Sequence, residues 1–155
     1  MSNVTRILVP TDFSEPADAA LDYAVDLSKT FGAQISLVHV FDEITNATLS
    51  FDQYMPLSAE TRDEILKAVR GRLAERVERS GRPDVTTDIL VGATARAIVD
   101  AARNHHADLI VMGTHGRLGV AHLLLGSVAE RVVRTAECPV LTVRASPAAR
   151  TAHAA

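Results

Sequence analysis

The sequence predicts an α/β protein, built on a doubly wound, open sheet of five parallel strands with helices on both faces. Two observations support this prediction. Five short apolar runs alternate with segments of helical periodicity along the 155-residue chain, which gives the order βαβαβαβαβ. Several of these runs are apolar almost without interruption, which is typical of parallel strands that helices cover on both sides.

The first strand and the first helix have clear boundaries. Residues 6–9 (RILV) form a short apolar run that Pro10 ends. Ser14 is the expected N-cap of the following helix, and Pro16 lies in its first turn, where proline is favoured. Apolar and small residues then recur at helical spacing until Gly32, a typical helix stop.

The middle of the chain contains a strand, an irregular segment and a long helix. Residues 34–41 (QISLVHVF) predict a second strand of nearly continuous apolar character. Residues 42–57 show no period, so we expect a long loop whose aromatic residues either fold over a bound base or pack on the surface. Residues 59–80 predict an amphipathic helix with an aliphatic stripe, and residues 81–83 (GRP) break it.

The second half of the chain repeats the alternation. Residues 85–91 predict a third strand with the partial alternation of a sheet edge, and a helix follows from residue 94. Residues 109–112 (LIVM) predict a buried fourth strand, and residues 140–143 (VLTV) predict the last one. Between these two strands a helix begins near Ser127. Three valines of that helix are expected to face the core: Val128, Val132 and Val133.

Length and composition predict one domain over residues 1–145, followed by a disordered tail over residues 146–155. Hydrophobic residues make up 47% of the chain and Trp is absent, so the core must be aliphatic. The formal charge of −3 gives no reason to expect nucleic acid or an anionic membrane as partner. No apolar run approaches the ~20 residues of a membrane span, and no signal-peptide pattern is present, so we expect a cytoplasmic protein. The single cysteine, Cys138, excludes an internal disulfide and a cysteine-cluster metal site.

Glycines follow the fourth strand in a pattern that suits phosphate binding. The strand ends at Gly113, and Gly116 and Gly126 come before the helix that begins at Ser127. Glycines let backbone N–H groups approach an anion, and the first turn of a helix adds unpaired donors and a positive dipole end. Two other interpretations stay open: the glycines only form turns, or Ser127 and Glu130 form a capping box.

The spacing of these glycines resembles a nucleotide-binding signature. Gly113 and Gly116 are separated by two residues, and nine more residues lead to Gly126 and Ser127. With the flanking VMGTHGR, LLLGSVAERV and CPVLTVR, and the Val-Pro-Thr-Asp after the start, the signature resembles the universal stress protein family. The resemblance covers residues 4–144 and implies an ATP-binding protein with strand order 3-2-1-4-5. In that order the first and fourth strands are neighbours at the topological switch point, where such sheets bind ligands.

The resemblance also implies a role for each residue of a nucleotide site. The backbone of Val40 meets the adenine edge. Asp12 approaches the ribose hydroxyls or, through water, a Mg²⁺ ion, which usually binds through phosphates, waters and one or two carboxylates. His115 and Arg117 are placed to add donors to the phosphates. The phosphate cradle and the strand ends around it comprise Pro10, Thr11, Met112, Gly113, Gly116, Gly126, Ser127 and Val128. Two alternatives stay open: Asp12 caps the first helix, and Val40 only packs in the core.

Three related phosphate-binding folds fail on particular residues. A dinucleotide fold needs G-x-G-x-x-G after the first strand, where this chain has residues 10–12 (PTD). A P-loop needs a lysine before the hydroxyl residue, and Gly126 precedes Ser127 here. A phospho-acceptor receiver domain needs an aspartate at the end of the third strand, where this chain has residues 91–93 (VGA).

Three functions therefore remain: an ATP-binding regulatory homodimer, a slow ATPase or phosphotransferase, and a nucleotide-free interaction module. Phosphoryl transfer needs a positioned base or water-orienting group together with charge clamps. The loop has no lysine, and paired carboxylates are absent, although His115 could orient a water. Binding of ATP without efficient turnover is therefore favoured. The protein partners and the inducing stress are not encoded in any motif that we recognise.

The last strand predicts a homodimer. In the implied strand order, residues 140–143 lie at an open edge of the sheet, where an apolar strand promotes aggregation unless it is covered. Antiparallel pairing with the same strand of a second copy would cover it in a closed two-fold dimer. The family resemblance implies the same contact.

Overall fold

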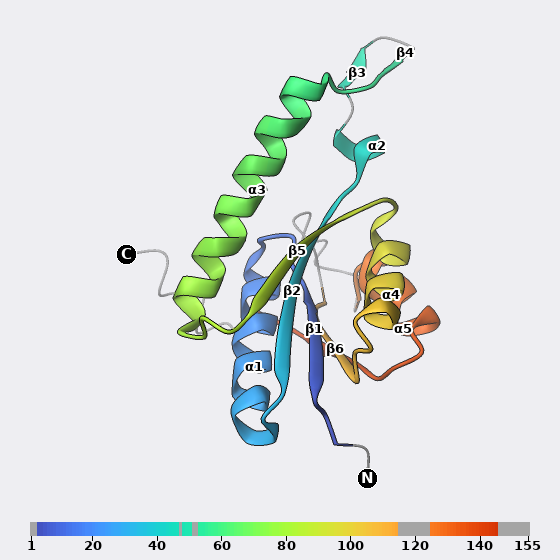
Figure 1. Ribbon diagram of the computed structural model, residues 1–155. Coiled ribbons are helices and arrows are strands. Elements are labelled where there is room, and N and C mark those ends of the chain that lie inside the picture. Colours follow the sequence, from blue (N-terminus) through green and yellow to red (C-terminus); the bar gives the residue numbers. More distant parts are fainter. Residues whose placement is uncertain (1–2, 47, 51–52, 115–124, 146–155) are drawn as a thin grey trace.

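The computed structural model describes residues 3–46, 48–50, 53–114 and 125–145 (Figure 1). Strands and helices alternate along the chain, with an additional short helix and a hairpin after the second strand. In chain order the elements are β1 (Arg6–Pro10), α1 (Glu15–Phe31), β2 (Gln34–Phe41), α2 (Glu43–Asn46), β3 (Thr48–Ser50), β4 (Gln53–Met55), α3 (Ala59–Ser80), β5 (Thr86–Val91), α4 (Thr94–Asn104), β6 (Leu109–Gly113), α5 (Ser127–Thr135) and β7 (Val140–Val143).

A five-stranded parallel sheet forms the centre of the protein. Its strand order is β5-β2-β1-β6-β7, and every neighbouring pair runs parallel. Numbered among themselves, these strands have the order 3-2-1-4-5, so the predicted doubly wound sheet is confirmed. β1 lies in the middle and pairs with β2 on one side and with β6 on the other.

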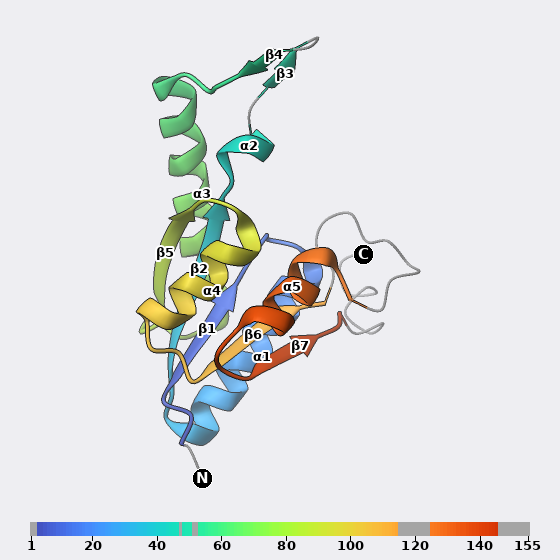
Figure 2. The same ribbon diagram turned by 90° about the vertical axis from the view of Figure 1, so that its right-hand side faces the viewer.

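Helices cover both faces of the sheet. α1 and α3 lie on one face, and α4 and α5 lie on the opposite face (Figures 1 and 2). Ile7 and Val9 of β1 point into the core under α1 and α3, whereas Leu8 points into the core under α4 and α5. All three side chains are buried, which explains why this strand reads as an uninterrupted apolar run.

The longest helix, α3, packs on the sheet through a narrow stripe. It has 22 residues, of which Val69 and Leu73 are buried. Most of its other side chains are charged or polar, as the predicted amphipathic pattern requires. Among the helices in the described part of the chain, none is both long and apolar enough to cross a membrane.

α1 begins and ends where the sequence predicts. Ser14 has an extended backbone, and its hydroxyl accepts a hydrogen bond from the Ala17 N–H at 3.4 Å. Pro16 lies in the first turn. Gly32 ends the helix in the left-handed conformation (φ 69°), and its N–H donates to the Ser28 carbonyl at 2.8 Å. The sequence is sufficient here because both ends are stabilised by residues that directly flank the helix.

The prediction of a long loop over residues 42–57 is wrong. α2 and the antiparallel hairpin β3–β4 occupy most of this range. Figure 1 shows them beyond the end of the main sheet, next to the N-terminal end of α3. These elements have only three or four residues each, which is too short for a hydrophobic period to be recognised.

One of the three predicted core valines of α5 is exposed. Val132 is fully buried and Val128 is partly buried, but the Val133 side chain is 46% exposed. The prediction that Val133 faces the core is therefore wrong. Consecutive residues of a helix point about 100° apart, and the stripe that α5 buries on the sheet is too narrow to include both neighbours.

Gly113, the last residue of β6, lies against the first turn of α1. A Cβ atom on Gly113 would lie 2.8 Å from the carbonyl carbon and from the Cβ of Pro16, and 3.0 Å from the Ala17 nitrogen. Atoms at these distances overlap, so a larger residue would separate β6 from α1. Packing alone is therefore a sufficient reason for glycine at this position.

We expect Gly113→Ala to lower the free energy of unfolding by about 1–3 kcal/mol, because the added methyl group overpacks this contact. Gly71→Ala is the matched control, since a Cβ at Gly71 in the middle of α3 meets no atom within 4 Å. That change should instead stabilise the protein by about 0.5–1 kcal/mol through the higher helix propensity of alanine. Urea denaturation of both variants measures the difference. Equal effects of the two substitutions would contradict the packing argument.

Asp108 connects the start of β1 to the start of β6. Its Oδ2 accepts hydrogen bonds from the Thr5 N–H at 2.8 Å, the Thr5 hydroxyl at 2.7 Å and the Arg6 N–H at 2.9 Å. These hydrogen bonds, chiefly the one from the Thr5 hydroxyl, hold the pKa of Asp108 below its usual value. The folded state therefore favours the ionised carboxylate.

We expect the stabilising effect of Asp108 to depend on pH. A lowered pKa contributes stability above about pH 4, the pKa of Asp in an unfolded chain, and this contribution is lost as the pH falls through the folded-state pKa. Asp108→Asn should therefore reduce the free energy of unfolding more at pH 7 than at pH 3, as measured by urea denaturation. Thr5→Val, which removes the hydroxyl donor, should show the same trend. A loss of stability that is equal at both pH values would rule out this linkage.

Candidate functional site

The carboxyl ends of β1 and β6 lie side by side at the same end of the main sheet. Leu8 of β1 is opposite Ile110 of β6, so both strands finish at the same end of the sheet. The chain continues from β1 into α1 on one face of the sheet, and from β6 into α5 on the other face. The carboxyl ends of β1 and β6 therefore form the topological switch point. Five predicted site residues lie here: Pro10, Thr11, Asp12, Met112 and Gly113.

Hydrogen bonds fix the turn after β1. The Thr11 N–H donates to the Val38 carbonyl at 2.8 Å, and the Thr11 hydroxyl accepts from the Phe13 N–H at 3.0 Å. The Asp12 carboxylate accepts from the Ser14 N–H at 3.0 Å and from the Ser14 hydroxyl. The alternative role of Asp12, stabilising the start of α1, therefore has direct support. The same contacts hold its carboxylate at the edge of the sheet.

β2 continues past the end of β1, and this determines what lies beside Val40. Pro10, the last residue of β1, is opposite Val38. The Val38 carbonyl points towards β1, where the turn after β1 donates to it, whereas the Phe41 carbonyl points towards β5 and accepts from the Gly92 N–H at 3.2 Å. Backbone groups alternate in direction along a strand, so the N–H and C=O of Val40 point to the β1 side, beyond the last residue of β1.

The side chain of Val40 has a separate role. It is partly buried and packs in the core under α4 and α5. The alternative interpretation of Val40 as a core residue is therefore met by its side chain. Its backbone, which points in a different direction, is not involved in that packing.

Two hydrogen bonds bring the start of α5 to the end of β6. The Thr114 N–H donates to the Val143 carbonyl at 2.9 Å, and the Gly126 N–H donates to the Thr114 carbonyl at 2.5 Å. Thr114 is buried. Gly126 and Ser127 are thus placed next to Gly113, although residues 114–125 separate them along the chain.

Among the residues that the structure describes, no side chain caps the N-terminus of α5. Gly126 is the N-cap, with an extended backbone (φ −67°, ψ 157°), and Ser127 is the first residue of the helix. The alternative of a capping box between Ser127 and Glu130 is therefore wrong. The first N–H groups of a helix have no acceptor within the helix, and with the helix dipole they favour an anion. In α1, by contrast, the Ser14 hydroxyl accepts one such N–H.

The remaining predicted site residues divide into two groups. Met112 is buried and Val128 is partly buried, and both side chains pack in the core under α4 and α5. His115, Gly116 and Arg117 lie outside the described residues, and their roles stay predictions.

Sequence reasoning did not single out Thr114, Phe13 or His39. Thr114 lies within the glycine motif, directly after Gly113, so the motif did contain it. Phe13 has a left-handed backbone (φ 64°), which a glycine or an asparagine would have indicated and a phenylalanine does not. His39 carries no signal in a strand sequence, and its contacts depend on the turn after β1.

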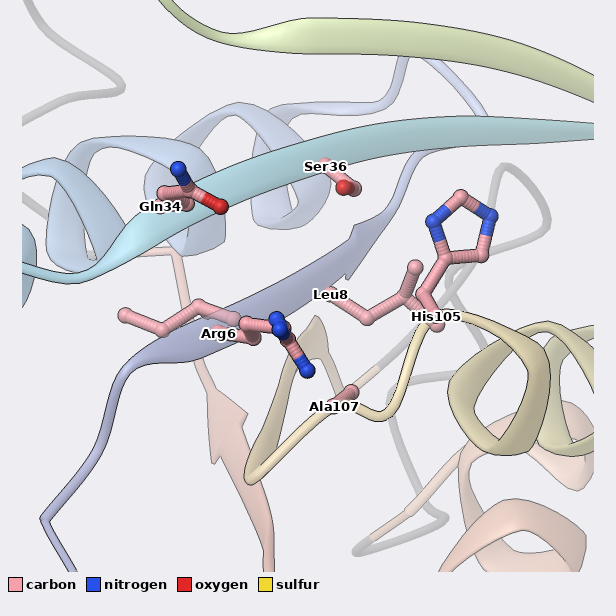
Figure 3. A pocket seen from close by; sticks show the side chains of 7 residues that line it. Arg6, Leu8, Gln34, Ser36, His105 and Ala107 are labelled. Atoms are coloured by element: carbon pink, nitrogen blue, oxygen red, sulfur yellow. The ribbon is translucent and has the colours of Figure 1, made fainter.

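A small hollow lies at the opposite end of the sheet (Figure 3). It has a volume of about 190 Å³. Its lining consists of Arg6, Ile7, Leu8, Gln34, Ser36, His105 and Ala107. Pockets that enclose small organic ligands usually measure about 300–1,000 Å³. Open α/β sheets bind ligands beyond the carboxyl ends of their strands, so we place the candidate site at the other end, next to Asp12 and Gly126.

No preformed metal cage is present in the described ranges. Within them, His, Cys, Asp and Glu side chains form no group of three or more that could hold a metal ion. Asp12 is the carboxylate at the candidate site. A Mg²⁺ ion at this edge would therefore need phosphate oxygens and waters for most of its coordination, which is how Mg²⁺ usually binds.

Comparisons with known proteins identify relatives of this chain. The sequence profile described as the universal stress protein family matches residues 3–144. Universal stress protein MJ0531 of Methanocaldococcus jannaschii is 38% identical over 143 residues, which cover 90% of this chain and 81% of that protein. Universal stress protein YxiE of Bacillus subtilis is 33% identical over 145 residues, which cover 90% of this chain and 98% of that protein.

Solved structures share the fold. Hypothetical protein MJ0577, also from Methanocaldococcus jannaschii, is 29% identical with a TM-score of 0.76, and the match covers 94% of this chain and 99% of that chain. A universal stress protein solved in complex with cAMP is 26% identical with a TM-score of 0.68, over 94% of this chain and 100% of that chain. From the profile match and these relatives, this chain belongs to the universal stress protein family.

Proposed function

We propose that this protein binds ATP at the carboxyl ends of β1 and β6 and acts as a homodimeric regulatory protein of the stress response. Occupancy by the nucleotide, rather than efficient turnover, would change its interactions with other proteins. One observation supports this best: the backbone groups of Val40 and those of the first turn of α5 lie at the same end of the sheet, beyond the end of β1.

These two sets match the two ends of an adenine nucleotide. The N–H and C=O of Val40 form a donor–acceptor pair, which suits the edge of a base. The uncapped first turn of α5 suits a phosphate. They lie on opposite sides of the end of β1, since β2 is its neighbour on one side and β6 on the other. A nucleotide that spans the end of β1 would reach both.

Asp12 lies between these two ends of the site. Its carboxylate is held by Ser14 at the start of α1. From there it would meet the ribose hydroxyls or, through a water, a Mg²⁺ ion carried by the phosphates. Gly113 would let the phosphates approach the backbone closely. His115 and Arg117 belong to the same proposal as phosphate donors.

The relatives support an adenine nucleotide as the ligand class. One structure of the family, at 26% identity to this chain, was solved in complex with cAMP. ATP differs from cAMP in having an open triphosphate chain, for which the helix N-terminus and the glycine motif of this chain are suited. The choice of ATP over other adenine nucleotides therefore rests on the phosphate side of the site.

We also propose that β7 forms the dimer interface. The Ile110 N–H donates to the Pro139 carbonyl at 3.0 Å, and the Thr114 N–H donates to the Val143 carbonyl at 2.9 Å. The backbone N–H and C=O groups of the odd-numbered residues in this strand therefore point towards β6. The backbone groups of Val140 and Thr142 point outwards, because directions alternate along a strand. β7 is an edge strand, and these groups are available to a second copy.

The two edges of the sheet differ in charge. β5, at the other edge, exposes the charged Asp88, and a charge of this kind opposes edge-to-edge pairing. β7 (VLTV) carries no charged residue. α1 and α5, which pack against β7, both expose an apolar side chain: Tyr23 is 50% exposed and Val133 is 46% exposed.

ATP binding is tested by calorimetric titration of the purified chain with ATP, with and without Mg²⁺, and with AMP and cAMP for comparison. We expect saturable ATP binding that weakens at least about tenfold in Gly126→Ala/Ser127→Ala, because one or two hydrogen bonds to a charged phosphate are lost or displaced. Gly71→Ala, a glycine change of the same size on α3, should bind like the parent chain. The nucleotide proposal fails if the parent chain does not bind, or if the double variant binds unchanged.

The dimer is tested by Thr142→Pro, measured by light scattering after size-exclusion chromatography. Proline removes the outward N–H of an edge strand without breaking a hydrogen bond to β6, so we expect a folded monomer. Thr87→Pro is the matched control, since the backbone of Thr87 points outwards on the opposite edge, β5. A parent chain that is monomeric, or a dimer that survives Thr142→Pro, would disprove this interface.

A further inference from the structure

We propose that Phe13, with His39 and Arg72, forms a clamp that positions Asp12 at the nucleotide site. The inference rests on the proposed function, because it concerns how that site is held. Phe13, His39 and Arg72 come from three elements: the turn after β1, β2 and α3. None of them is among the residues predicted to touch the nucleotide, so they would act as positioning residues.

Phe13 adopts a backbone conformation that most residues avoid. Its φ is 64°, in the left-handed region where the Cβ of an L-residue comes too close to a carbonyl oxygen. The side chain is nevertheless buried, at 8% exposure. Strained backbone of this kind persists where the surrounding structure over-determines it, and it is concentrated at ligand sites and clamps. The contacts of the Phe13 ring show what holds it.

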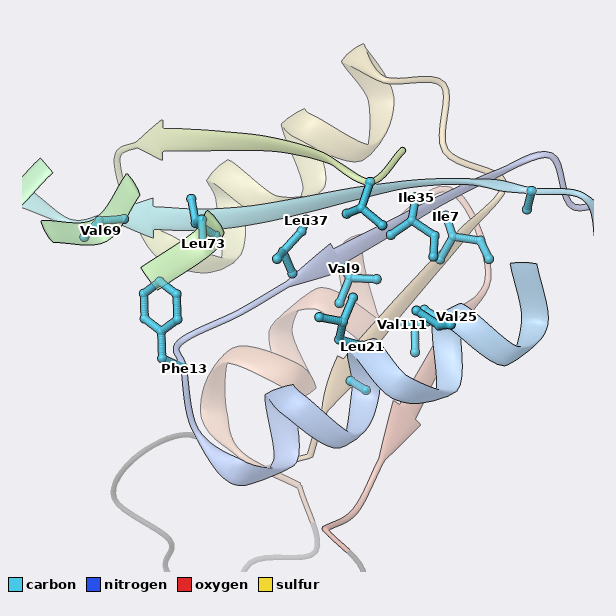
Figure 4. Packing of buried hydrophobic residues seen from close by; sticks show 14 residues of the cluster. Ile7, Val9, Phe13, Leu21, Val25, Ile35, Leu37, Val69, Leu73 and Val111 are labelled. Atoms are coloured by element: carbon cyan, nitrogen blue, oxygen red, sulfur yellow. The ribbon is translucent and has the colours of Figure 1, made fainter. Parts of the chain in front are cut away.

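The ring of Phe13 is held by cationic and aromatic groups. It stacks on the His39 ring, with 4.8 Å between the centroids and 29° between the planes. The guanidinium of Arg72 lies 4.0 Å from the ring centroid and that of Arg76 lies 5.4 Å from it, both within the range of a cation–π contact. Figure 4 shows Phe13 at the end of the core cluster, close to Leu73 of α3.

The backbone on both sides of Asp12 is held as well. The Nδ1 atom of His39 lies 2.8 Å from the Thr11 carbonyl oxygen, which makes it a donor to the residue before Asp12. The Arg76 Nη2 lies 3.5 Å from the Phe13 carbonyl oxygen, on the residue after it. β2 and α3 therefore fix Thr11 and Phe13, and Asp12 has little freedom between them.

Arg76 also ties α3 to α1. Its Nε donates to the Asp18 carboxylate at 3.1 Å, and its side chain is only 13% exposed. A change at Arg76 would therefore disturb helix packing as well as the turn. Arg72, one turn earlier on α3 and more exposed, is the better probe of the clamp, because it reaches the ring without the ion pair to Asp18.

The clamp predicts a coupling between Arg72 and Asp12. Arg72→Met keeps the length of the side chain and removes its charge, and should weaken ATP binding about two- to fivefold by loss of the cation–π contact of an exposed arginine. In an Asp12→Asn background, the same substitution should weaken binding much less, because the group that it positions is already altered. Calorimetric titration of the four proteins measures this coupling. A general loss of structure would instead weaken binding equally in both backgrounds.

Two further variants separate the clamp from ordinary packing. Arg72→Lys retains a cation for the Phe13 ring and should restore most of the affinity. Arg70→Met, on the same helix but about 200° away around its axis, should bind ATP like the parent chain. Equal affinities of the parent chain, Arg72→Met and Arg70→Met would overturn the clamp and leave the proposed nucleotide site intact.

A readout without nucleotide keeps the clamp testable even if ATP does not bind. The Ser14 N–H donates to the Asp12 carboxylate, so its hydrogen exchange reports on how firmly the turn is held. Arg72→Met should accelerate exchange at the Ser14 amide, while the amides of Leu21 and Val25 in the buried part of α1 keep their protection. Unchanged exchange at Ser14 would refute the clamp. Absence of ATP binding by the parent chain would refute the proposed function instead.

Discussion

The early end of β1 is the constraint on which the candidate site depends. β1 stops opposite Val38, whereas β2 continues for three more residues to Phe41. The chain turns away through Thr11 and Asp12, and the β1-facing side of β2 is left beyond it. Because β2 is longer than β1, the backbone groups on the β1 side of residues 39–41 have no β1 residue opposite them. If the two strands ended at the same level, the backbone groups of Val40 would face a residue of β1.

The two helices that start at this end of the sheet, α1 and α5, have different N-termini, and only that of α5 suits a ligand. The N-terminus of α1 is capped by nearby residues: the Ser14 hydroxyl accepts a hydrogen bond from an N–H of the first turn, and the Asp12 carboxylate accepts hydrogen bonds from Ser14. α5 begins at Ser127, and its N-cap residue, Gly126, provides no side-chain hydrogen bond. Gly113 lies between them, and it is so close to Pro16 that an added Cβ atom would overlap the first turn of α1. Of these two helix N-termini, only that of α1 has a side-chain cap among the described residues.

Residues far from this space contribute to its shape. α3 packs on the sheet through only two buried side chains, Val69 and Leu73, yet its arginines reach Phe13 and Asp18. Through these contacts the turn that carries Asp12 depends on a helix that begins 47 positions later in the chain, at Ala59. These contacts connect α3 directly to the turn after β1.

The sequence by itself determined the strands, the main helices and the boundaries of α1, because these depend on hydrophobic period and on residues close together in the chain, such as Ser14 and Gly32. The resemblance in the glycine motif supplied the strand order. Only the tertiary structure decided the hairpin β3–β4, the exposure of Val133, the left-handed backbone of Phe13 and the direction of the Val40 backbone. Each of these depends on strand register or on packing between distant segments, and neither leaves a local pattern in the sequence.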